Sequence, residues 1–253
     1  MLGQWLEVSV QCDDVLESLA FYKALGFREL QTGDAWAHRY AVISDGDLSI
    51  GLHDRTFDSP ALTFVQPDLG RHARSMADHG FDFSFLKLDE DHFNELGFVD
   101  TEGNNIVMIE ARTCSPPPDD IGDSLCGTFF ELTLPARDTL HAARFWAPLA
   151  PHVERLREEP TTHMRFDAGG MALGLSESIA LDRPSLCFKC HDPERLAATV
   201  ERHGFRWQKY PGFEGAHGVL QAPEGTRLYV FDEDFLGETY EVTEEEGPPP
   251  ATA

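Results

Sequence analysis

The chain has few basic residues and no apolar run long enough to cross a bilayer. Acidic residues outnumber lysines and arginines 44 to 20, which gives a formal net charge of −24. A chain of this charge repels phosphate backbones and anionic lipid surfaces. We therefore expect neither a nucleic acid nor a membrane as its partner.

Disulfide-forming cysteines and export signals are also scarce. Five cysteines are an odd number, which argues against a disulfide framework and favours reduced thiols in a cytoplasm. The first residues, MLGQWLEVSV, have neither the basic segment nor the apolar core of a secretory signal peptide. A cytoplasmic location is the expectation.

What the sequence does contain is an internal repeat. The stretch LEVSVQCDDVLESLAFYKALGF from Leu6 matches FELTLPARDTLHAARFWAPLAP from Phe130, with Glu7 against Glu131 at an offset of 124. The stretch from Leu62 matches that from Leu186 at the same offset, and DTEGNNIVMIE matches APEGTRLYVFD at an offset of 122. So many matches at nearly one offset indicate two homologous halves.

Within each half, a strand leads into a helix twice. Around residues 6 to 12 apolar residues alternate with Glu7, Ser9 and Gln11, a period of two that predicts a half-buried strand with these three facing inward. The following DVLESLAFYKALGF predicts a helix with Asp13 or Asp14 as N-cap and Gly26 near its end.

Two segments interrupt this pattern. Residues 113–124, TCSPPPDDIGDS, have the composition of a linker, and residues 237–253 are an acidic, proline-bearing stretch that we expect to be a disordered tail. The predicted domains are therefore residues 1–112 and 125–236.

Two sets of residues in the first half form a recognisable pattern. The first set is Glu7, Asp14, Ser18, Phe21 and Tyr22 with Leu-Gly-Phe at 25–27, and the second is Asp100, Gly103, Asn104 and Ile106. It resembles the vicinal oxygen chelate superfamily of glyoxalase I, bleomycin-resistance proteins and extradiol dioxygenases. The resemblance implies an α+β fold of four βαβββ units, in which each half is a curved mixed sheet that forms a cup with helices outside.

In that family, enzymes hold a divalent metal in the cup with His, Glu or Gln ligands. The first ligand position falls on Glu7 and Glu131, and the second on Gly51 and Gly174. The remaining positions fall near Ala61 and Ser185 and on Val107 and Tyr229. Since one ligand type of four remains in each half, we expect no metal, and a divalent metal is the alternative.

Histidines elsewhere in the sequence do not supply the missing metal ligands. His38 and His163 lie in corresponding strands but not at equivalent positions, and His53, His92 and His217 are predicted to lie in solvated turns. The two histidines and carboxylate that an extradiol dioxygenase needs are absent from the expected positions.

Glu7 and Glu131 are the candidate catalytic residues and the expected polar focus of any ligand. The predicted ligand-binding residues are Glu131, Thr133, Ser185, Lys189 and Tyr229 in the second half and Glu7, Ser9 and Gln11 in the first. The second half offers more polar chemistry and is the expected working site. The alternative is structural, with each glutamate either paired to an inward arginine or lysine, such as Lys189, or hydrogen-bonded to the opposing unit.

One motif invites a different interpretation. Cys187, Cys190 and His191 have the C-x-x-C-H spacing of covalent haem attachment. The repeat places both cysteines on one strand, where residues three apart point to opposite faces. We therefore expect no haem and regard the spacing as accidental.

The sequence favours a glyoxalase- or bleomycin-resistance-like protein, a monomer or homodimer, that binds a small organic molecule in a cup without metal or other cofactor. Two alternatives remain. One is a divalent-metal lyase, isomerase or dioxygenase of the same superfamily, and the other is a non-catalytic interaction scaffold.

Overall fold

The computed structural model describes residues 2–32, 38–89, 94–111, 121–150, 153–158, 162–208 and 216–232. In the first half the elements are β1 (Gln4–Gln11), α1 (Val15–Ala24), β2 (Arg28–Leu30), β3 (Tyr40–Ser44), β4 (Ser49–His53), β5 (Ala61–Gln66), α2 (Leu69–Asp78), β6 (Phe85–Lys87), β7 (Glu95–Val99) and β8 (Asn105–Glu110). In the second half they are β9 (Thr128–Pro135), α3 (Thr139–Trp146), β10 (Val153–Arg157), β11 (His163–Ala168), β12 (Met171–Ser176), β13 (Ser185–Cys190), α4 (Pro193–His203), β14 (Trp207–Gln208), β15 (Ala216–Gln221) and β16 (Arg227–Asp232).

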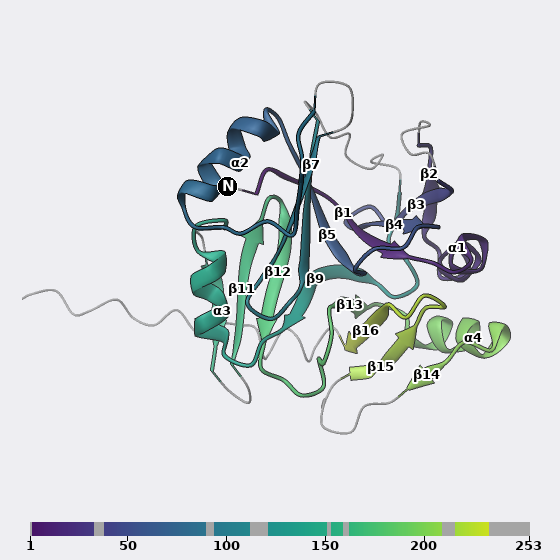
Figure 1. Cartoon of the computed structure of the whole chain (residues 1–253). Helices are drawn as coiled ribbons and strands as arrows, with labels where there is room; N and C mark the ends of the chain where they lie inside the picture. The colour runs from purple at the N-terminus through teal and green to yellow at the C-terminus, as the bar shows by residue number, and fades with distance from the viewer. Residues whose placement is uncertain are drawn as a thin grey trace, which may run out of the picture.

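Each half forms one eight-stranded mixed sheet, and the two sheets have the same topology (Figure 1). The strand orders are β2-β3-β4-β1-β5-β8-β7-β6 and β10-β11-β12-β9-β13-β16-β15-β14. In the first sheet β1 runs parallel to β4 and antiparallel to β5, so that two βαβββ units join along the β1–β5 pair. The predicted α+β fold of four such units is confirmed.

The predicted domain boundaries stay a prediction. Residues 112–120 of the linker region lie outside the described residues, as does the predicted tail at 237–253. In the part of the chain that the structure describes, no helix is long and apolar enough to span a membrane.

Helix α1 begins where the sequence predicts. The Asp14 side chain accepts hydrogen bonds from the backbone N–H groups of Leu16 at 2.9 Å and Glu17 at 3.3 Å, and so satisfies donors that the helix itself leaves free. Gly26 follows the helix with φ of 95°, a conformation that a residue with a Cβ rarely adopts. Asp138 caps α3 in the same way.

Strand β1 departs from the predicted alternation at Leu6. Its ladder with β5 pairs Trp5 with Phe64 and Glu7 with Thr63, which leaves Leu6 as the extra residue of a β-bulge. Leu6 therefore lines the cup beside Glu7 instead of facing the helices. The equivalent strand β9 has the same irregularity at Phe130.

The two halves contact each other through pairs of phenylalanines related by the repeat. Phe21 of α1 packs on Phe205, just beyond α4, with ring centroids 4.7 Å apart. Phe145 of α3 packs on Phe81, just beyond α2, at 5.5 Å. Each partner is offset by 124 residues from its counterpart, so the contact is reciprocal. Figure 1 accordingly shows α1 next to α4 on one side of the molecule and α3 next to α2 on the other.

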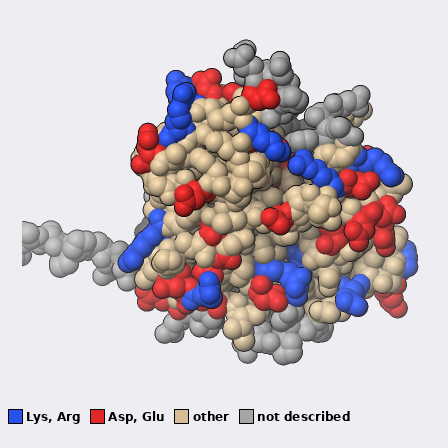
Figure 2. Space-filling model, in the orientation of Figure 1, with Lys and Arg blue, Asp and Glu red and all other residues tan. Residues whose placement is uncertain are grey.

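Figure 2 shows acidic side chains spread over the face in view with basic ones between them.

A polar contact joins the halves beside the first of these pairs. The Tyr22 hydroxyl donates to Glu224 Oε1 at 2.7 Å, and the Ser18 hydroxyl donates to Glu224 Oε2 at 2.7 Å. Complete burial, followed by the charge of Glu224, raises the pKa of Tyr22 well above its usual value. Tyr22 is therefore a permanent donor to a charged acceptor across the interface between the halves.

We expect Tyr22→Phe to lower the free energy of unfolding by about 1.5 to 3 kcal/mol, because it removes a hydrogen bond to a charged group. Urea unfolding followed by circular dichroism measures the change. In a Glu224→Gln background the same substitution should cost clearly less. An equal cost in both backgrounds would show that the hydrogen bond is not the cause.

Candidate functional site

The cup of the first sheet is hollow. It encloses a cavity of about 270 Å³ whose wall is mainly apolar, with Val42, Phe57, Phe85, Val107 and Ile109 among its side chains. Polar residues lie along one part of the wall, where Glu7 and Ser9 of β1 meet His53 of β4 and Thr63 of β5. The predicted inward orientation of Glu7 and Ser9 agrees with this arrangement.

Glu7 is buried at the centre of a hydrogen-bond network. The Ser9 hydroxyl donates to Glu7 Oε1 at 2.8 Å, and His53 Nε2 lies 3.1 Å from the same oxygen. Ser9 Oγ also lies 2.8 Å from Thr63 Oγ1. Among the described residues, none donates a hydrogen bond to Glu7 Oε2. One carboxylate oxygen is thus held by protein, while the other receives no hydrogen bond from the described residues.

A glycine makes room for this carboxylate. A Cβ built on Gly51 would lie 2.1 Å from Glu7 Oε1, far closer than real Cβ contacts allow. The residue at the family's second ligand position is therefore replaced by space, and the Glu7 side chain occupies that space. Gly174 does the same in the second half, where a Cβ would lie 2.5 Å from Glu131 Oε1.

The prediction that His53 lies in a solvated turn is wrong. His53 is the last residue of β4, pairs with Tyr40 across the ladder and is 5 % exposed. The sequence signal that reveals this position is the match of LSIGLHD to MALGLSE, which places His53 two residues beyond Gly51 on the same face of a strand.

His53 has a second histidine behind it. His38 Nε2 lies 3.0 Å from His53 Nδ1. Burial, followed by the neighbouring His53 and Arg55, lowers the pKa of His38, which favours its neutral form. A neutral His38 that donates its Nε2–H fixes His53 as the tautomer that donates Nε2–H to Glu7. The result is an ordered chain from His38 through His53 to the carboxylate.

The second half contains a glutamate–histidine pair that is more deeply enclosed. Glu131 is 1 % exposed, with His163 Nε2 at 3.1 Å from Oε1 and 3.3 Å from Oε2, and the Thr133 hydroxyl donates to Oε1. Burial by itself raises the pKa of Glu131, but His163, Thr133 and Arg165 together hold that pKa below its ordinary value of 4.5. His163, not Lys189, is therefore the partner of this glutamate.

The two histidines come from different strands. His53 lies in β4, and the residue at its position in the second half is Ser176. His163 lies in β11, opposite Ser176, at the position that Tyr40 occupies in the first half. Each half therefore has one histidine at this pair of facing positions. In the first half it lies on β4, and in the second half it lies on β11, the equivalent of β3.

Large side chains fill the second cup. Cys187, Tyr229, Phe231, Val219 and Leu181 form a buried cluster on its inner face. Tyr229 is fully buried and its hydroxyl donates to the Ala180 carbonyl. The first half has Val107 and Ile109 where the second has Tyr229 and Phe231. The sequence favours the second cup as the working site, whereas the structure opens this cavity in the first.

The other predicted ligand-binding residues lie around these two centres. Thr133 contacts both Glu131 and Cys187. Ser185 is buried and donates to the Arg183 carbonyl, Lys189 is partly exposed, and Gln11 accepts a hydrogen bond from the Phe57 N–H beside the first cup. The structure thus brings Glu7 and Ser9 to the cavity wall, and it places Gln11 just outside that wall.

The two cysteines of the C-x-x-C-H motif point to opposite faces of β13, as predicted. Cys187 belongs to the cluster in the second cup, whereas Cys190 belongs to the main core and its thiol lies 3.9 Å from the Leu125 carbonyl. Burial, followed by the charge of Glu131, holds the pKa of Cys187 well above its ordinary value. Neither haem attachment nor a joint metal site is compatible with this arrangement.

The residues of the first cup do not fit a divalent metal. The positions that the family uses carry Glu7, Gly51, Ala61 and Val107, and three of these four have no donor side chain. His53 directs one ring nitrogen at Glu7 and the other at a second histidine, so these groups satisfy one another. Over the described residues, no group of three or more His, Cys, Asp or Glu side chains could hold a metal ion.

Comparison with solved structures identifies relatives of this architecture. The chain resembles a catechol 2,3-dioxygenase (TM-score 0.55, 13% identity, 90% of this chain and 87% of that one). It also resembles the 2,2',3-trihydroxybiphenyl 1,2-dioxygenase of Sphingomonas wittichii (TM-score 0.59, 14% identity, 92% of this chain and 91% of that one). A third similar structure is a variant of homoprotocatechuate 2,3-dioxygenase from Brevibacterium fuscum (TM-score 0.60, 13% identity, 98% of this chain and 74% of that one). No protein-family model and no curated protein matches the sequence.

These likenesses establish the fold. The chain has the fold of these dioxygenases, as the resemblance of its motifs predicts. At identities of 12–14% they carry no activity over to this chain.

We expect Glu131→Gln to lower the free energy of unfolding at pH 7 by about 1.5 to 3 kcal/mol, because the buried His163 and Thr133 lose a charged acceptor. The folded-state pKa of Glu131 lies below its ordinary value, so the charge stabilises the protein above the unfolded pKa, near 4.5. That stabilisation is lost as the pH falls through the folded-state pKa.

Urea unfolding of both proteins between about pH 3 and pH 7 measures the effect, and the difference should shrink below about pH 4.5. Glu194→Gln, on the exposed surface of α4, is the control and should change stability by less than about 0.5 kcal/mol. A stability difference that grows as the pH falls would contradict the assignment.

Proposed function

We propose that the first cup binds one small, mainly apolar organic molecule without a metal, and that Glu7 is the polar focus of that site. The observation that carries this proposal is a cavity of about 270 Å³ in which a buried carboxylate keeps one oxygen free of protein donors. An apolar pocket with a few convergent polar groups is the usual form of a small-molecule site.

The cavity limits what the ligand can be. Its volume lies at or below the lower end of the usual range for ligand pockets, about 300 to 1,000 Å³, and suits a molecule of one or two rings. Phe57 and Phe85 offer ring faces and edges to such a molecule. Glu7 Oε2 then accepts a hydrogen bond from a hydroxyl or N–H group of the ligand. This is binding of the glyoxalase/bleomycin-resistance type, and the second cup is its filled structural counterpart.

A second candidate is a divalent-metal dioxygenase. The dioxygenase fold of its structural neighbours favours it, as does the presence of two histidines and two carboxylates, Glu7 and Glu95, around a single cavity. The arrangement of those side chains counts against it, because His38 contacts His53 instead of approaching Glu7. Elemental analysis of the purified protein after dialysis against a weak chelator distinguishes the two, since one bound metal ion per chain would favour the dioxygenase.

The binding proposal predicts that 2-naphthol, a two-ring molecule with one hydroxyl, binds the wild-type protein in isothermal titration calorimetry. Val107→Tyr should abolish that binding, because it introduces the side chain that fills the second cup at the equivalent position. Glu7→Gln should weaken it about ten- to a hundredfold, the loss expected for a hydrogen bond to a charged group.

Tyr229→Phe, a change in the second cup, is the matched control and should leave the affinity unchanged. Thermal unfolding of each variant verifies that it is folded. Binding that survives Val107→Tyr would place the ligand elsewhere and refute the proposal.

A further inference from the structure

The environment of Glu7 provides more than a place for a ligand. We propose that the first cup catalyses proton transfer at carbon, with Glu7 as the general base that removes an acidic α-hydrogen from a bound cyclic or aryl ketone. This inference rests on the proposed binding function and extends it to a metal-free enolisation.

The base is the free oxygen of Glu7. Its Oε1 is fixed by Ser9 at 2.8 Å and His53 at 3.1 Å, so the carboxylate is oriented, while none of the described residues donates to Oε2 and the Glu7 residue lines a mainly apolar cavity. An apolar wall excludes water from the reacting groups, so a carboxylate held there can approach a bound C–H group directly. General base catalysis requires this combination of fixed geometry and an available lone pair.

His53 and His38 are positioning residues. They follow the logic of a catalytic triad, in which the reacting group is held by a second group that a third one orients. His38 Nε2 lies 3.0 Å from His53 Nδ1, and a hydrogen bond that it donates there leaves the proton of His53 on Nε2, which faces Glu7. In the second cup both oxygens of Glu131 lie within 3.3 Å of His163.

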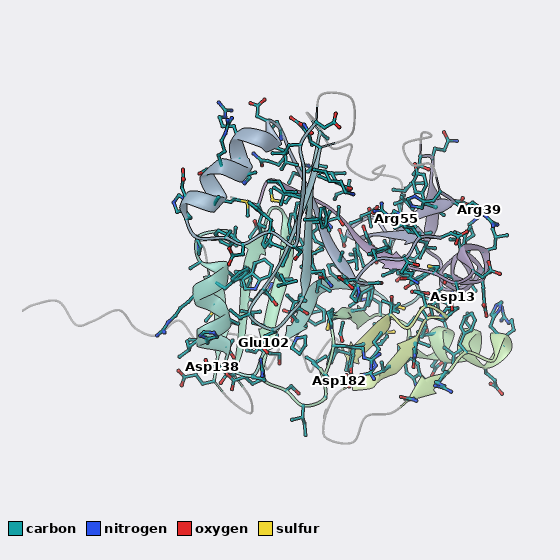
Figure 3. The ribbon with its side chains drawn as sticks, in the orientation of Figure 1. Asp13, Arg39, Arg55, Glu102, Asp138 and Asp182 are labelled. Carbon is teal, nitrogen blue, oxygen red and sulfur yellow. The ribbon has the colours of Figure 1, made fainter. Side chains whose placement is uncertain are left out.

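A cation lies where the oxygen of the ketone would gain charge. Arg55, labelled in Figure 3, follows β4, lines the same cavity and is exposed. Its N–H groups can donate to a carbonyl oxygen and stabilise the enolate that forms there. The cavity is thus lined by the Glu7 carboxylate, a cationic donor and mainly apolar side chains, with Glu95 also in its wall.

The step balances without an oxidant or a metal. The α C–H bond breaks and its proton moves to Glu7 Oε2. The bonding electron pair forms the C=C bond, and the carbonyl π pair moves onto the oxygen, where Arg55 stabilises it. Return of a proton from Glu7 to the carbon regenerates the ketone, and in D₂O this carbon acquires deuterium once Glu7 has exchanged with solvent.

The test uses 2-tetralone, a neutral two-ring ketone with acidic α-hydrogens. Its α-deuteration in D₂O is followed by proton NMR with and without the full-length protein, and its binding is measured by calorimetry. We expect the wild type to accelerate exchange in a saturable manner. Glu7→Gln should slow the protein-dependent rate about 100-fold or more, the usual contribution of a general base. Glu194→Gln, the same change on the exposed surface of α4, should leave the rate unchanged.

The positioning role has its own readout. His38→Ala should lower kcat for exchange while the Kd of 2-tetralone stays the same, and His38→Gln, whose amide can donate to His53 Nδ1, should restore part of kcat. Val107→Tyr should abolish binding and exchange together without touching the base. Circular dichroism of each variant verifies its fold.

The outcomes separate the two proposals. Saturable binding of 2-tetralone without accelerated exchange would overturn the catalytic inference and leave the binding function standing. Exchange that is unaffected by Glu7→Gln would overturn the assignment of the base. Failure of both 2-tetralone and 2-naphthol to bind would overturn the binding function and the inference with it.

Discussion

The structure of both cups depends on a glutamate carboxylate that occupies the space left by the missing side chain of a glycine. Glu7 and Glu131 lie across Gly51 and Gly174, at positions where a Cβ would lie within 2.1 to 2.5 Å of a carboxylate oxygen. A side chain at either glycine would force the carboxylate away from its histidine. The family's second ligand position is thus converted into the space that a hydrogen-bonded carboxylate requires, and a buried carboxylate must have such partners.

Both halves have this close contact between a glutamate and a glycine. The halves differ in the volume of the side chains that line the two cups. Val107 and Ile109 leave a cavity above Glu7, whereas Tyr229 and Phe231 close the same space above Glu131. In the closed cup both oxygens of Glu131 lie close to His163. Burial there raises the pKa of the carboxyl, but His163, Thr133 and Arg165 hold it below its ordinary value, so the pair stabilises the fold. The open cup keeps one oxygen of Glu7 available, which is what a binding or catalytic carboxylate needs.

Sequence patterns predicted the fold well because they depend on local chemistry. Period-two alternation, the cap at Asp14 and the repeat together define strands, helices and the two sheets, and these agree with the structure. The site was predicted in part. Alternation places Glu7 and Ser9 inward, but it cannot reveal the bulge that turns Leu6 into the cup. Nor does it report the volume left between facing side chains, and it therefore favoured the cup with more polar residues over the one that is open.

The histidines show why a site of this kind escapes a search by aligned positions. A hydrogen bond to the carboxylate needs a donor at the right point in space, and either of two facing strand positions can supply it. The first half uses His53 of β4 and the second uses His163 of β11, so comparison of the halves column by column finds no shared histidine. The choice of strand has a chemical consequence. On β4 the imidazole of His53 meets His38 through its second nitrogen, and a hydrogen bond donated there would leave the proton of His53 on the nitrogen that faces the carboxylate. The same pair of residue types therefore lies beside a cavity in one cup and among large buried side chains in the other.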